Sequence, residues 1–134
     1  RKASDIKNRV AIINSSTNPV LISIHQNSLP QAKSVHGAQV FFNTKEGSES
    51  LAKSVQDHLN RSINMDRAKD MRQIDSSVYL MRHCKCPAIL VECGFLSNES
   101  DTYLLKTENH QKKIALTVAA GYLAWNSSGE QEYS

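Results

Sequence analysis

One histidine and one glutamate occupy the two most apolar stretches of this 134-residue chain. His25 ends the run "NPVLISIH", and Glu92 interrupts the run "PAILVECGF". An unpaired carboxylate in an apolar strand is costly to bury, so Glu92 needs a reason to be there. An imidazole can bind a divalent metal, and a nearby carboxylate with a raised pKa can act as a general base. We therefore treat both as candidate site residues, with a purely structural role as the alternative for His25.

The segments around these residues predict alternating helices and strands. Short apolar runs predict strands that end at His25, Phe42 and Phe95, with Pro19 and Pro87 opening the first and the last. Apolar residues at helical spacing predict helices through Ile6, Val10 and Ile13, through Leu51, Val55, Leu59 and Ile63, and through Ile114, Val118, Tyr122 and Trp125. Ser48 is the expected cap of the second of these helices, and Asn98 that of a short helix through Leu105.

This alternation predicts a three-layer α/β fold, with a mainly parallel sheet covered by helices on both faces. Sites in such sheets lie at the carboxyl ends of the strands. His25 and Glu92 stand at or near two such ends, so the sequence predicts that they meet at one rim.

Composition restricts the class of protein. The chain is 40% hydrophobic and 22% charged, and its length is that of one domain. Its net charge of +3 is spread along the sequence without a cluster of Lys and Arg, so nucleic-acid binding is not expected. No apolar run is long enough to cross a bilayer, and residues 1–9 contain no signal-peptide core.

The cysteines Cys84, Cys86 and Cys93 are odd in number and predict buried thiols rather than a disulfide framework or a zinc site. One alternative function is an α/β hydrolase with Cys93 as its nucleophile. Because Cys93 follows Glu92 directly in a predicted strand, the two side chains should lie on opposite faces, which disfavours that alternative.

Five segments carry a resemblance to a known family, in order and over nearly the whole chain. They are "LISIHQNS", "GAQVFF", "SLAKSVQDHLN", "PAILVECGFLSN" and "HQKKIALTVAAGY", and "RKASDIKNRVAIIN" precedes them. This series resembles the zinc-dependent N-acetylmuramoyl-L-alanine amidases of the family-3 type, in particular the spore-cortex amidases of endospore formers. The resemblance implies a peptidoglycan hydrolase with roles in sporulation and germination.

The resemblance also implies roles for individual residues. His25 would be a ligand of Zn²⁺, and Glu92 would be the catalytic carboxylate that activates water and protonates the leaving amine. Asn27 would orient either its loop or the ligand. Gly94 would allow close backbone approach, and Asn98 would cap the following helix.

The family's other zinc ligands, a histidine in a Gly-rich loop and a glutamate on the next helix, have no counterpart in this sequence. Residues 1–126 are therefore expected to be the C-terminal portion of one amidase domain, with 127–134 as a polar tail. An export signal is expected upstream and an extracytoplasmic location is implied. An accessory protein, or self-association through an open sheet edge, is a further expectation. The alternative function is a wall- or partner-binding fragment without catalysis.

Overall fold

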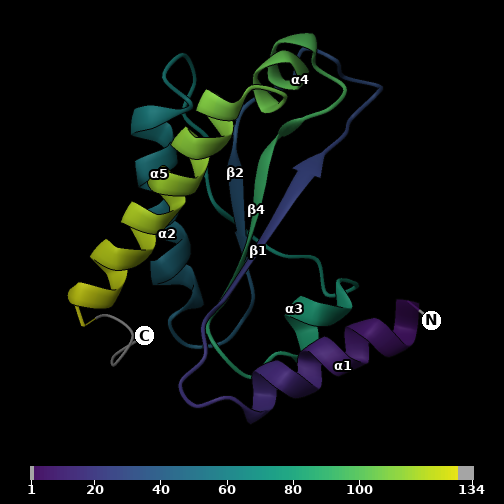
Figure 1. Cartoon of the computed structure of the whole chain (residues 1–134), viewed down its shortest axis with the longest axis vertical. Coiled ribbons are helices and arrows are strands. Elements are labelled where there is room, and N and C mark those ends of the chain that lie inside the picture. The colour runs from purple at the N-terminus through teal and green to yellow at the C-terminus, as the bar shows by residue number, and fades with distance from the viewer. Residues whose placement is uncertain (1, 130–134) are drawn as a thin grey trace.

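A computed structural model describes residues 2–129, which form a four-stranded sheet with helices on both faces (Figure 1). The elements in chain order are α1 (Lys2–Ser15), β1 (Leu21–Asn27), β2 (Gln39–Phe42), α2 (Ser48–Ser62), β3 (Arg72–Gln73), α3 (Tyr79–His83), β4 (Ala88–Phe95), α4 (Glu99–Leu105) and α5 (Glu108–Ser127). The α/β fold class and the predicted strands and helices are thus confirmed.

The sheet has the order β1-β4-β2-β3, so the strand that carries Glu92 lies inside it and the strand that carries His25 lies at its edge. Strand β4 pairs in parallel with β1, and β2 pairs in parallel with β3. Between β2 and β4, however, the pairing is antiparallel. The mainly parallel sheet is confirmed, with this one antiparallel pair as a difference from the expectation.

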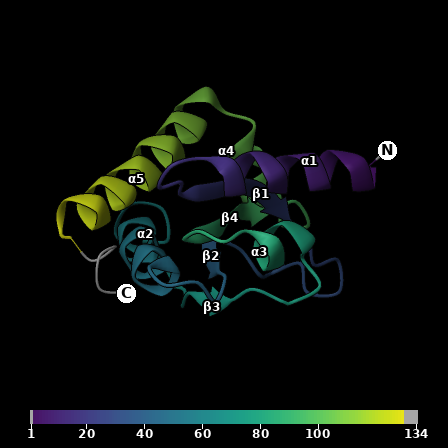
Figure 2. The same cartoon turned by 90° about the horizontal axis from the view of Figure 1, so that it is seen from below.

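The two faces of the sheet are covered differently. Helices α2 and α5 pack on one face, and α3 lies on the other with α1 beside it (Figure 2). The core under α2 and α5 is the larger, and its sheet side is formed by Val40, Ile89, Val91 and Cys93. The smaller core around Met81 and Leu90 covers only the Ala88 end of the second face. The Glu92 end of that face therefore has no helix over it in the described residues.

Helices α2 and α5 approach each other closely at Gly121. A Cβ atom at this position would lie 2.7 Å from the Cα atom of Val55, so only glycine allows the contact. The carbonyl of Gly121 accepts a hydrogen bond from the Ser54 hydroxyl at 2.7 Å, and the Trp125 indole donates to the Ser50 hydroxyl at 2.9 Å. These contacts fix the helix pair that supports the sheet from behind the candidate site.

The predicted cap of α2 is wrong by one residue. Gly47, with a φ of 89°, is the N-cap, and Ser48 is the first helical residue. The Ser48 hydroxyl instead donates a short hydrogen bond to the Asn43 side chain and accepts one from the Ala88 N–H at 2.9 Å. Asn43 also donates to the carbonyls of Met81 and Cys86. The serine that the local sequence predicts as a cap thus forms buried hydrogen bonds with distant segments instead.

Candidate functional site

His25 and Glu92 lie side by side in neighbouring parallel strands. Their Cα atoms are register partners in the β1 and β4 pair, so both side chains project from the same face of the sheet. Gln39 of β2 is the register partner of Glu92 on its other side. The predicted convergence of His25 and Glu92 at one place in the sheet is therefore confirmed, whereas their chemical roles stay predictions.

The Glu92 carboxylate is half-buried and incompletely paired. Its Oε2 atom is buried without a hydrogen-bond partner in the part of the chain that the structure describes. Burial raises the pKa of Glu92, and the nearby His25 imidazole acts in the opposite direction. A carboxyl group with an unused buried oxygen and a raised pKa is suited to accept a proton from a bound molecule.

The His25 ring is exposed and is held by a neighbour on its own strand. The Ser23 hydroxyl lies 2.8 Å from Nε2 of His25. Residues two apart in a strand share a face, so the sequence contained the signal for this contact, although Ser23 was not among the predicted site residues. No sequence pattern indicated Gln39, because its position beside Glu92 results from a pairing between distant strands.

A bulge follows the site in β4. The register changes between His25 and Asn27. In unbroken register Asn27 would pair with Gly94, but it pairs with Phe95. Asn27 accepts a hydrogen bond from the Ser28 N–H at 2.8 Å through its side chain, and its carbonyl accepts from Leu96 at 2.7 Å. These contacts favour the loop-orienting role for Asn27, while a role toward a ligand stays a prediction.

Asp101 of α4 fastens the end of β4 to the neighbouring loop. This buried carboxylate accepts hydrogen bonds from the N–H groups of Gly37 at 2.9 Å and Phe95 at 2.8 Å. Asn98 caps α4 as predicted, since its side chain accepts from the Asp101 N–H at 3.0 Å. A Cβ atom at Gly94 would lie 3.1 Å from the Asp101 carboxylate, so the expected close approach at this glycine is also present. The network holds the Glu92 strand end and the start of β2 together.

We expect Asp101→Ala to lower the free energy of unfolding by about 2–4 kcal/mol, because two backbone N–H groups lose their acceptor. Asp101→Asn, which keeps one acceptor oxygen, should lose less. Urea unfolding followed by circular dichroism measures both values. The control is Asp57→Ala, which removes a single i,i+4 ion pair with Lys53 and should change stability by under about 1 kcal/mol. Equal stability of Asp101→Ala and the wild type would refute this role.

The thiols do not join the site. Cys93 is buried in the core on the opposite face from Glu92, and burial raises its pKa to about 11, which argues against a thiolate nucleophile. Cys84 and Cys86 are buried as expected. Across residues 2–129, no three His, Cys, Asp or Glu side chains are grouped so that they could hold a metal ion. His25 is thus a single donor beside a carboxylate, and these residues alone do not make a complete zinc site.

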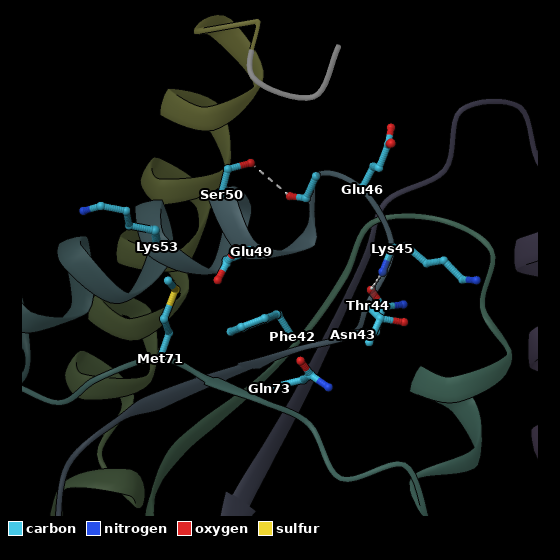
Figure 3. Close-up of a pocket in the computed structure, with 11 residues that line it drawn as sticks. Phe42, Asn43, Thr44, Lys45, Glu46, Glu49, Ser50, Lys53, Met71 and Gln73 are labelled. Atoms are coloured by element: carbon cyan, nitrogen blue, oxygen red, sulfur yellow. Dashed lines mark hydrogen bonds between the residues drawn. The ribbon is translucent and has the colours of Figure 1, made fainter. Parts of the chain in front are cut away.

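One cavity lies at the other end of β4 from Glu92. It has a volume of about 590 Å³ and is lined by Phe42, Met71 and Gln73 together with residues 43–47 and the first turns of α2 (Figure 3). The drawn side chains include both Lys45 and Glu46, and no cluster of one charge forms there. A second cavity of about 510 Å³ opens beside Asn27, Gln39 and Phe95, next to the candidate site.

Comparison with known sequences identifies the class of protein. Residues 1–123 match the family described as N-acetylmuramoyl-L-alanine amidase, and the chain belongs to this family. The chain is 39% identical, over 126 residues, to the germination-specific N-acetylmuramoyl-L-alanine amidase of Bacillus subtilis; the match covers 93% of this chain and 52% of that protein. It therefore spans about half the length of this relative. The resemblance seen in the sequence is confirmed.

Solved structures agree with this assignment. The CwlD amidase of Clostridioides difficile, determined in complex with the GerS lipoprotein, superposes with a TM-score of 0.88 at 34% identity and covers 95% of this chain and 64% of its own. An N-acetylmuramoyl-L-alanine amidase from Clostridium difficile 630 has a TM-score of 0.82 at 29% identity, with coverage of 92% and 66%. The likeness to amidases therefore extends to the fold.

Proposed function

We propose that the protein containing this chain is an N-acetylmuramoyl-L-alanine amidase, which hydrolyses the amide between N-acetylmuramic acid and L-alanine in peptidoglycan. The observation that carries this proposal is the register of His25 with Glu92, together with the unpaired Oε2 atom of that carboxylate. Membership of the amidase family supports the same reaction. On this proposal, residues 1–126 are the C-terminal portion of one catalytic domain. Ser127 ends α5, and residues 130–134 of the expected tail lie outside the described residues.

Glu92 would act on protons at the scissile amide. Its carboxylate would take a proton from the attacking water and then give a proton to the leaving L-alanine amine. Oε2 is buried and has no hydrogen-bond partner in the described residues, so proton transfer to the carboxylate would break no existing hydrogen bond of this atom. Gln39, on the neighbouring strand, would limit how far the substrate can move along this face.

His25 would provide one ligand of Zn²⁺, and the other ligands would come from residues outside this chain. An exposed imidazole next to an unpaired carboxylate oxygen supports this assignment. When bound, zinc would polarise the carbonyl of the amide and lower the pKa of water. Ser23, in hydrogen-bond contact with Nε2 of His25, would have to turn away if that nitrogen coordinates the metal, because a coordinated nitrogen neither donates nor accepts a hydrogen bond.

The proposal extends to the setting of the enzyme. A germination-specific relative and the CwlD likeness support action on spore cortex, outside the cytoplasm. The structure of CwlD with GerS supports an accessory lipoprotein as a partner. In the part of the chain that the structure describes, no helix has the length and apolarity needed to span a membrane.

The test is hydrolysis of purified cortex and vegetative peptidoglycan by the full-length protein loaded with zinc. We expect new free N-terminal L-alanine, detected by dinitrophenylation, to appear in step with peptide-free glycan strands. Cleavage elsewhere in the peptide would show a different hydrolase. Stable binding to the wall without release of L-alanine would favour the non-catalytic binding module instead.

A further inference from the structure

A polar cavity continues from the candidate site along the carboxyl ends of β1 and β4. It is the cavity of about 510 Å³ that Asn27, Gln39 and Phe95 line on the sheet side. Gln39 stands next to Glu92 in the sheet, and its side chain donates to the carbonyl of Asp70 at 2.8 Å. The loop that leads into β3 therefore passes, at Asp70, one side chain away from Glu92.

This loop brings positive charge to the cavity. Arg67, Lys69 and Arg72 all line it, against one carboxylate, that of Asp70. Asp66 does not line this cavity, and it pairs with His36 at 2.6 Å. None of the ion pairs found within residues 2–129 includes Arg67, Lys69 or Arg72. Among the residues that line it, the cavity thus has more cations than carboxylates, and the three cations form no ion pair within the described residues.

Lys69 is held in place within this cluster. The backbone N–H of Lys69 donates to the Asn60 side chain at 3.0 Å, and the backbone carbonyl of Lys69 accepts from the same side chain at 2.8 Å. The ammonium group lies 5.3 Å from the centre of the Phe95 ring. Burial and the charges of Arg67 and Arg72 lower the pKa of Lys69, and the Asp101 carboxylate acts in the opposite direction. An ammonium group confined beside two guanidinium groups would be stabilised by a bound anion.

We propose that this cavity binds a carboxylate on the peptide part of the substrate, through Lys69 and the guanidinium groups of Arg67 and Arg72. The proposal rests on the proposed function. If the scissile amide of the substrate lies beside the Glu92 carboxylate, the attached peptide is within reach of the adjoining loop. Guanidinium groups match a carboxylate with paired hydrogen bonds, and an ammonium group adds charge. The acidic group would belong to one of the first residues after the scissile amide, since an extended peptide advances about 3.3–3.6 Å per residue.

The experiment measures binding of two soluble muropeptides that differ only in whether the peptide carboxylates are free or amidated. Binding is measured by titration calorimetry with the full-length protein carrying Glu92→Gln. This substitution prevents turnover during the measurement. We expect the free-carboxylate form to bind about 5- to 20-fold more tightly. The double variant Arg67→Gln/Lys69→Met should remove this preference, Arg72→Gln should reduce it, and the remote Lys85→Met should retain it.

Equal affinity of the two muropeptides for the Glu92→Gln protein, in which the cavity residues are unchanged, would overturn the proposal, and this comparison needs no substitution within the cavity. A preference that survives the double variant would also overturn it, as would charge-dependent binding of a phosphate-bearing wall polymer alone. The readout is independent of hydrolysis. A protein that binds the acidic muropeptide but never releases L-alanine would contradict the proposed function and leave the carboxylate site standing.

Discussion

Replacing Glu92 with glutamine is expected to lower kcat/KM for release of L-alanine by about 10²- to 10⁴-fold, the usual contribution of a positioned general base. Glutamine keeps the shape of the side chain but cannot accept the proton. The loss should appear in kcat rather than in KM, because proton transfer takes place only as the reaction proceeds. Activity on a soluble muropeptide, measured in the full-length protein with zinc, provides the values.

The control for this variant is Glu46→Gln, since Glu46 is exposed and lies at the far end of the sheet. It should retain wild-type kcat and KM. Thermal unfolding should show that Glu92→Gln is folded, and its stability should not fall, because the buried Oε2 atom has no hydrogen bond to lose in the described residues. Retained activity in Glu92→Gln, combined with loss of activity in Cys93→Ala, would replace the carboxylate mechanism with a thiol one.

The second large effect is expected on metal content. His25→Ala in the full-length protein should weaken zinc binding by more than about 100-fold, because even residues that only orient a metal ligand contribute about 10- to 100-fold. Zinc bound after exhaustive dialysis, measured by inductively coupled plasma mass spectrometry, should fall from near one atom per chain to a small fraction. Amidase activity should fall with it.

His83→Ala is the matched control, because His83 is also exposed and its ring contacts Tyr79 rather than the site. It should keep the zinc content of the wild type. Full zinc retention by His25→Ala would show that this imidazole is not a ligand. In that case the alternative of a purely structural role for His25, held by its contact with Ser23, would stand.

The edge position of β1 bears on how this chain behaves by itself. Along it lies an apolar groove of about 500 Å³ that includes Ile22, Ile24 and Tyr122, and the Ile24 side chain is 56% exposed. An unpaired strand edge next to an apolar surface favours association with another strand. The expectation of self-association through an open sheet edge therefore stays a prediction, and experiments on this chain alone should monitor its oligomeric state.

Local sequence determined most of the elements of this fold. The four-residue spacing of Leu51, Val55 and Leu59 predicts α2, and these three side chains are fully buried. The apolar runs around His25 and Glu92 predict the two strands, whose parallel register brings the residues together. Periodicity and turn residues are properties of short segments, so they can be read without knowledge of the rest of the chain.

Tertiary structure decided what lies around the site. The antiparallel pairing of β2 with β4 places Gln39 beside Glu92. The hydrogen bond from Gln39 to Asp70 then brings the loop of Arg67 and Lys69 to that side of the sheet. Ser48 does not cap α2, because its hydroxyl is hydrogen-bonded to the Asn43 side chain and to the Ala88 N–H. These contacts join segments far apart in the chain, and their formation depends on how the whole core packs. Local spacing therefore contains no signal for them, whereas it does predict the strands that carry His25 and Glu92.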